Sequence, residues 1–134
     1  MNDRVFFDTN VLVYILASSD SRGKRAEQLF FDGGIVSVQV LDEFTDVARR
    51  KIRMPWDDVK DALKVIRIFC PEPVAITIDT HELALRIAEE HEIRIYDALI
   101  VASALEANCD VLYSEDFQDG QVVEGLSIRN PFAA

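Results

Sequence analysis

The sequence predicts an α/β fold of three layers, in which a mostly parallel central sheet lies between two layers of helices. Short runs rich in β-branched and aromatic residues alternate along the chain with longer segments of helical periodicity. The β-rich runs are apolar at successive positions, as in parallel strands that helices cover on both faces. The 134 residues contain no internal repeat, low-complexity tract or linker, so we expect one domain over residues 1–134.

The first half of the chain predicts two strands and four helices. Gly33-Gly34 ends the second helix, Pro55 opens the fourth, and Val40, Phe44 and Val47 form the apolar stripe of the third. The expected elements are a strand at Val5–Phe7, helices near Val11–Leu16 and at Lys24–Phe31, a strand at Ile35–Val38, and helices at Gln39–Arg50 and Trp56–Phe69.

The second half continues the alternation after Pro71 and Pro73 break the chain. A helix capped by Asp79 or Thr80 should run to about His91. The next helix is apolar on nearly every side and should be buried. The remaining elements are a strand at Val74–Ile78, that buried helix at Tyr96–Asn108, a strand at Val111–Tyr113 and a short strand at Leu126–Ile128 before Asn130-Pro131-Phe132.

The charge of the chain argues against binding nucleic acid through the field of the whole surface. The net charge is -10 and the pI is about 4.5, which repels phosphates at low salt. A divalent metal would invert the sign of an acidic cleft, and most Lys and Arg lie between Arg22 and Arg67, including the run at 49–53. Each of these cations alone is typical of a solvated helix face. As a group they could instead form a basic rim beside an acidic centre.

Two further features bear on the class of protein. No apolar run approaches the roughly 20 residues that span a bilayer, and the N-terminus lacks a signal-peptide layout, so we expect a cytoplasmic protein without membrane contact. Cys70 and Cys109 are far apart and form no Cys-x-x-Cys pair. We expect both to be reduced structural thiols.

Three aspartates are expected at one edge of the sheet. Asp8 directly follows the first strand, Asp97 lies in the opening turn of the buried helix, and Asp116 follows the strand Val111–Tyr113 closely. Ligands of open α/β sheets bind outside the carboxyl ends of the strands, where helices begin. Taken singly, Asp8 and Asp97 also fit helix caps and Asp116 fits a turn.

A fourth acid is expected to point toward the same edge. A helical wheel of Gln39–Arg50 places Glu43 beside the apolar stripe, whereas Asp42 and Asp46 point away from it. Alone, Glu43 also fits a half-buried surface acid. Four carboxylates in one cleft would repel one another unless a cation neutralised them, and with oxygen ligands only, Mg²⁺ is preferred to Zn²⁺, with Mn²⁺ as a substitute.

This metal chemistry suits hydrolysis of a phosphodiester bond, because the metal activates water and stabilises charge on the leaving oxygen. His81 and His91 are expected on an exposed helix and receive no role. We expect Asp8 and Asp97 to be the central ligands, Glu43 and Asp116 to complete the site directly or through water, and Asn10 and Ser114 to support them by hydrogen bonds.

The expected acids lie in four short segments, which follow one another along the chain as Phe7-Asp8-Thr9-Asn10, Val40-Leu41-Asp42-Glu43-Phe44, Tyr96-Asp97-Ala98-Leu99-Ile100 and Tyr113-Ser114-Glu115-Asp116-Phe117. In this order they resemble the successive motifs of the PIN-domain nucleases, and in particular those of the VapC-type toxins of toxin-antitoxin pairs. The resemblance implies an Mg²⁺-dependent endoribonuclease, a homodimer and an antitoxin partner that blocks the site. It also implies that Asp119 is an occasional extra acid, and the closing Asn130-Pro131-Phe132 is similar to a subgroup's tail.

Other functions stay open at this point. A housekeeping RNA-processing nuclease of the same fold would carry the same acids, because toxicity depends on target and expression. A receiver-like or phosphatase-like domain also gathers aspartates and Mg²⁺, but usually needs a lysine near the site, and no lysine follows Lys64. A PIN-like binding module with structural acids is the third alternative. The RNA target depends on groove shape, which the sequence does not reveal.

Overall fold

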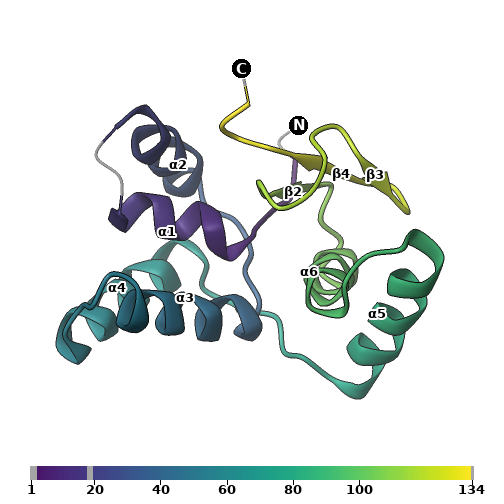
Figure 1. The fold of residues 1–134 in the computed structure, drawn as a ribbon, viewed down its shortest axis with the longest axis horizontal. Helices are drawn as coiled ribbons and strands as arrows, with labels where there is room; N and C mark the ends of the chain where they lie inside the picture. The colour runs from purple at the N-terminus through teal and green to yellow at the C-terminus, as the bar shows by residue number, and fades with distance from the viewer. Residues whose placement is uncertain (1–2, 18–19, 134) are drawn as a thin grey trace.

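The computed structural model describes residues 3–17 and 20–133 (Figure 1). Within them β1 is followed by six helices and then by three strands, so the regular alternation of strands and helices expected from the sequence is wrong. The helices α1 to α4 gather on one side of the molecule, whereas α5 and α6 pack against each other on the other side. The predicted three-layer α/β/α architecture is confirmed. The elements are β1 (Val5–Phe7), α1 (Thr9–Ala17), α2 (Ser21–Phe31), α3 (Val38–Arg50), α4 (Trp56–Phe69), α5 (Ile78–His91), α6 (Ile95–Glu106), β2 (Val111–Tyr113), β3 (Val122–Val123) and β4 (Leu126–Arg129).

The sheet has the strand order β1-β2-β4-β3. β1, β2 and β4 are parallel, with Phe7 opposite Tyr113 and Leu112 opposite Ile128, and β3 runs antiparallel to β4. The Asp8 amide donates to the Tyr113 carbonyl at 3.0 Å, which continues the pairing of β1 and β2 by one residue. The chain segments that leave β1 and β2 therefore start side by side.

The core lies between the sheet and the helices on both faces. Phe6, Phe7, Phe44, Leu112 and Ile128 are fully buried or nearly so. α6 is buried along most of its length, as its all-round apolar sequence predicts. No helix in the described part of the chain is both long and apolar enough to cross a membrane.

The expected strand at Ile35–Val38 is wrong in extent. Ile35 pairs with Phe6 and Ser37 pairs with Val74, but only as isolated bridges. α3 already begins at Val38, because the Ser37 hydroxyl accepts a hydrogen bond from the Val40 amide at 3.2 Å. A side-chain cap of this kind starts a helix even where β-branched residues favour a strand.

The expected strand at Val74–Ile78 is also wrong, and so is the predicted cap of the next helix. Only Val74 pairs, and α5 begins at Ile78 with Thr77 as its N-cap. Thr77 and Thr80 form a reciprocal capping box, in which each side chain accepts from the other residue's amide at 3.1 Å. The helix thus starts earlier than the Asp79 or Thr80 cap implied.

The strand β3 was not anticipated from the sequence. Val122 and Val123 pair with Ser127 and Leu126, and the chain reverses through Glu124 and Gly125, whose φ angles are 51° and 90°. Two consecutive left-handed residues are what a tight two-residue hairpin turn requires. Two residues are too short a run to show the alternation that identifies a strand.

Both cysteines behave as the sequence suggests. Cys70 and Cys109 are free and buried. Burial raises the pKa of the Cys70 thiol to about 12 and that of Cys109 to about 11. At neutral pH both are therefore protonated and unreactive.

The observed cap of α5 generates a prediction. Thr77→Ala should lower the free energy of unfolding by about 1 kcal/mol, because it removes the acceptor of the Thr80 amide. Asp79→Ala is the matched control and should cost less than about 0.5 kcal/mol, since it loses only an interaction with the helix dipole. Urea denaturation of both variants measures the difference. Equal losses in the two variants would contradict the observed cap.

Candidate active site

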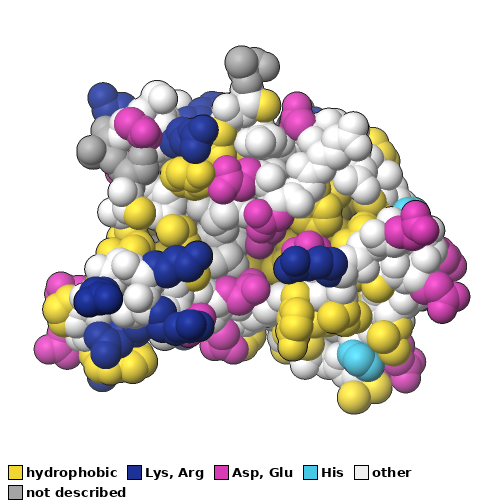
Figure 2. Space-filling view, in the orientation of Figure 1, with side chains coloured by type: hydrophobic (Ala, Val, Ile, Leu, Met, Phe, Trp, Pro, Cys, Tyr) yellow, Lys and Arg dark blue, Asp and Glu magenta, His cyan; other side chains and the backbone are white. Residues whose placement is uncertain are grey.

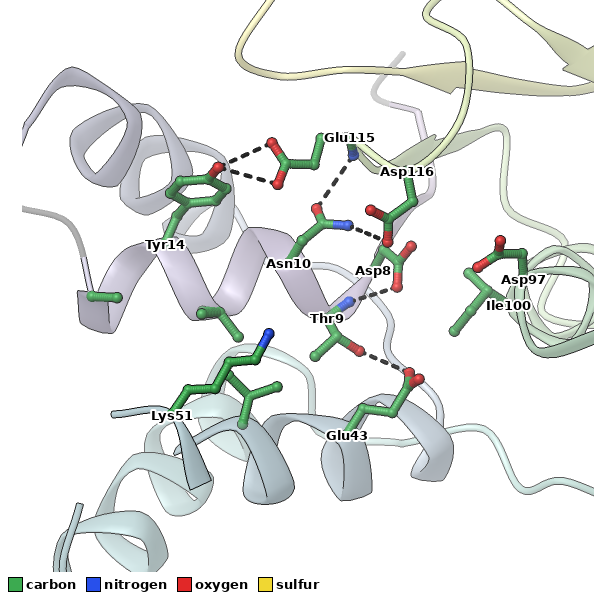
Figure 3. A pocket seen from close by; sticks show the side chains of 13 residues that line it. Asp8, Thr9, Asn10, Tyr14, Glu43, Lys51, Asp97, Ile100, Glu115 and Asp116 are labelled. Carbon is green, nitrogen blue, oxygen red and sulfur yellow. Dashed lines mark hydrogen bonds between the residues drawn. The ribbon is translucent and has the colours of Figure 1, made fainter. Parts of the chain in front are cut away.

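A cleft of about 600 Å³ opens where β1 and β2 end, and all four acids expected from the sequence line it (Figure 3). They come from four segments that are distant in sequence. Asp8 follows β1, Glu43 lies on α3, Asp97 lies in the first turn of α6, and Asp116 follows β2. The fold thus brings the predicted carboxylates together at one edge of the sheet.

Asp8 is the most deeply placed of these acids, with 4% of its surface exposed. One carboxylate oxygen accepts from the Thr9 amide at 2.7 Å, and the other accepts from the Ser114 hydroxyl at 2.8 Å. Both bonds are short, as charge-assisted bonds are. The two donors fix the orientation of the carboxylate at the floor of the cleft.

Asn10 and Ser114 hold the segment after β2 against α1. The Asn10 side-chain amide donates to Asp116 Oδ2 at 3.1 Å, and its oxygen accepts from the Glu115 amide at 3.3 Å. The Ser114 hydroxyl accepts from the Asp116 amide at 3.1 Å. The two polar residues expected to support the site therefore both contact its acids, Asn10 at Asp116 and Ser114 at Asp8.

Glu43 is held from α1 as well, because the Thr9 hydroxyl donates to its Oε1 at 3.0 Å. The other two acids of α3, Asp42 and Asp46, are exposed, and Asp46 pairs with Arg50 at 3.3 Å. Glu43 is therefore the acid of α3 that reaches this cleft, as the helical wheel predicted. Asp97 lies across the cleft from Glu43, with the Arg94 guanidinium 3.9 Å from its Oδ2.

Burial and mutual repulsion act on these carboxylates together. Burial, with smaller contributions from Asp116 and Glu43, raises the pKa of Asp8 to about 7, although the hydrogen bonds from Ser114 and Thr9 lower it. Burial also raises the pKa of Glu43, to which Asp97 and Asp116 add. Burial raises the pKa of Asp97 too, against the opposing effect of Arg94. The protein alone therefore disfavours the ionised forms of these three acids.

Four polar cleft residues, Thr9, Tyr14, Lys51 and Glu115, received no role from the sequence. Tyr14 donates to both carboxylate oxygens of Glu115 at 3.1 Å, and Thr9 bridges two acids through its amide and hydroxyl. Tyr14 lies one helical turn after Asn10, so the periodicity of α1 carried a signal for it. Lys51 follows Glu43 by eight residues, but it lies one residue beyond the helix expected to end at Arg50, so the helical wheel of that helix did not include it.

Asp119 and the histidines lie elsewhere. Asp119 accepts from the Asn130 amide at 2.8 Å and is not among the residues that line the cleft. The exposed His81 lies on α5. His91, at the end of the same helix, lies 3.4 Å from Glu124.

His91 belongs to a separate group of metal-binding residue types. Glu90, His91 and Glu124 place ligand atoms within 4.8 Å of one another. Arg86 pairs with Glu90 at 2.9 Å and with Glu124 at 2.8 Å. Because this guanidinium already compensates the two glutamates, the group serves to tie α5 to the β3–β4 hairpin.

Comparison with solved structures finds the same fold among toxin-antitoxin proteins. A toxin-antitoxin complex from Klebsiella pneumoniae matches with a TM-score of 0.74 and 20% identity, over 97% of this chain and 99% of that one. VapC20 of Mycobacterium tuberculosis, described as a toxin that cleaves the sarcin-ricin loop, matches with 0.69 and 20%, over 85% and 91%. VapBC2 of Rickettsia felis, bound to a DNA fragment from its promoter, matches with 0.68 and 20%, over 94% and 97%.

Comparison at the level of sequence is more selective. No curated protein sequence matches the chain. A family model described as the PIN domain matches residues 5–119, a range that includes all four acids of the cleft. The chain therefore belongs to the PIN domain family.

Proposed function

We propose that this protein is a metal-dependent endoribonuclease that hydrolyses phosphodiester bonds of RNA and acts in the cytoplasm as the toxin of a type II toxin-antitoxin pair. The observation that carries the proposal is the convergence of Asp8, Glu43, Asp97 and Asp116 on one cleft in a chain of the PIN family. The similar structures include a toxin described as cleaving the sarcin-ricin loop and complexes with antitoxins. They support RNA as the substrate and an antitoxin as a partner, and we also infer a homodimer.

The chemistry of the cleft fits a divalent metal. Its described lining residues offer carboxylate oxygens and no His or Cys, a donor set that favours Mg²⁺, with Mn²⁺ as a substitute. The raised pKa of the buried Asp8 shows that its ionised form lacks a compensating positive charge. We assign Asp8 and Asp97 as central ligands, with Glu43 and Asp116 completing the site directly or through water. A divalent ion there would supply an activated water and offset charge on the phosphate.

The neighbouring residues act as positioning residues. Thr9 and Ser114 each use one hydrogen bond to hold Asp8, which leaves further lone pairs on both carboxylate oxygens. Asn10 and Ser114 hold the Asp116 segment, and the Thr9 hydroxyl holds Glu43. We propose a structural part for Asp119, which binds the Asn130 amide.

The first prediction from the proposed function concerns cleavage of RNA. Purified protein should cut a mixed RNA pool with Mg²⁺ or Mn²⁺ and not with chelator. Glu43→Gln should lower the rate of cleavage by about 100-fold or more. It removes a carboxylate that helps to hold the metal, and the metal would offset the charge that develops on the phosphate in the transition state. Asp42→Asn is the matched control on the same helix and should leave the rate within about twofold, since Asp42 is exposed outside this cleft. Equal effects of the two substitutions would contradict the assignment.

The second prediction concerns stability and pH. The pKa of Asp8 rises from 3.8 to about 7 on folding, so protonation of Asp8 stabilises the fold. That stabilisation is complete below about pH 4 and is lost as the pH rises through 7. Asp8→Asn carries no charge, and above pH 7 with chelator its free energy of unfolding should exceed that of the wild type by roughly 3 to 4 kcal/mol.

Chemical denaturation between pH 4 and 8 measures this difference, which should shrink toward low pH. Mg²⁺ should stabilise the wild type at pH 8, because only the folded state presents the site, and should have little effect on Asp8→Asn. A wild type that is the more stable protein at pH 8 in chelator would show that the Asp8 charge is compensated within the chain.

The third prediction separates a toxin from a housekeeping nuclease of the same family. Induced expression of the wild type should arrest growth, Glu43→Gln should not, and co-expression of the product of the neighbouring gene should restore growth. Growth curves with matched protein levels measure this. Normal growth with an active nuclease would favour RNA processing, because the chemistry of the cleft is common to both roles.

A further inference from the structure

The cleft contains one cation among its described lining residues, and this is Lys51. Lys51 is the C-cap residue of α3 and is exposed. In Figure 3 its ammonium group lies on the α1–α3 side of the cleft, at the opposite end from Asp97. The cleft therefore has an acidic part and, beside it, a positively charged end.

Two other cations near the end of α3 are already engaged. Arg49 donates to the Met54 carbonyl at 2.7 Å, and its guanidinium lies 4.6 Å from the centre of the Trp56 ring. Arg50 pairs with Asp46 at 3.3 Å. Within the part of the chain that the structure describes, Lys51 forms no ion pair, so its charge is available to a ligand.

Apolar side chains line the cleft together with the acids and Lys51, namely Val13 and Ala17 of α1 and Val47 of α3. Val47 follows Glu43 by four residues and precedes Lys51 by four, so it lies between them along one face of α3. A single RNA strand presents phosphates separated by a sugar and a base. An acidic metal centre, an apolar strip and a free ammonium in this order match a phosphate, a nucleoside and a second phosphate.

We propose that Lys51 binds the RNA phosphate that flanks the scissile one, with the nucleoside between them packed on Val13 and Val47. The inference rests on the proposed ribonuclease function and adds a substrate subsite to it. A lysine suits this role because its flexible stem carries a point charge that a phosphate binds without demanding a fixed geometry. The contact between Lys51 and a phosphate matters for RNA affinity because the net charge of the chain is -10, and its overall field repels RNA.

The test is RNA binding as a function of salt, with the protein in the Glu43→Gln background so that the RNA stays intact. The probe is a fluorescent random-sequence 12-nucleotide RNA, titrated by anisotropy in Mg²⁺. Lys51→Gln should weaken binding about fivefold near 0.1 M salt and make the slope of log K against log salt shallower by about 0.7, the effect of one lost contact to a single strand. Lys51→Arg should restore both quantities.

Lys60→Gln is the matched control, because Lys60 is exposed on α4 and lies outside the cleft. It should leave affinity and slope unchanged. With the catalytic Glu43 restored, Lys51→Gln should raise KM and leave kcat within about twofold.

Two results would overturn the inference. An unchanged salt slope with lower thermal stability would mean that Lys51 serves only the C-terminus of α3. A parent protein that binds no RNA even at low salt would remove the proposed function itself, and with it this subsite.

Discussion

The parallel pairing of β1 with β2 is the constraint on which the chemical part of this molecule depends. Phe7 lies opposite Tyr113, and the next residues are therefore Asp8 and Ser114 at the same edge of the sheet. These two residues are 106 positions apart in sequence and 2.8 Å apart in space. Since α1 starts immediately after Asp8, the same pairing also brings Thr9 and Asn10 to the acids. A shift in register would dismantle all of these contacts at once.

This arrangement buries the carboxyl group of Asp8, whose charged form the surrounding protein alone disfavours. Burial, with smaller contributions from two neighbouring carboxylates, raises the pKa of Asp8 to about 7. The buried core of aromatic and aliphatic side chains supplies the stability that offsets this cost. Local destabilisation that a ligand would relieve is a frequent property of binding sites. Occupancy of the proposed metal site would therefore stabilise the segments that build it.

The acids could be predicted because their positions follow from simple periodicities. The ends of parallel strands meet at one edge, and a helical wheel separates Glu43 from Asp42. The two wrong strands show where such reasoning ends, since the side chains of Ser37 and Thr77 accept backbone hydrogen bonds that start helices within runs that favour strands. Lys51 lies one residue beyond the helix expected at Gln39–Arg50, so the helical wheel that selected Glu43 did not include it, and the cleft that it lines forms only when α3 packs against α1.

Part of the basic stretch noted in the sequence makes contacts within the chain. Arg22 donates to Tyr14, and Arg49 and Arg50 are held by groups of α3 and its neighbour. These are three of the ten cations between Arg22 and Arg67, and Figure 2 shows several Lys and Arg side chains over α3 and α4, beside acidic side chains near the middle of the view. Under the proposed function, a chain of net charge -10 would gain little from non-specific attraction to RNA. Affinity for the strand would then come from the proposed metal and a few contacts in the cleft, and the same contacts would place the strand for cleavage.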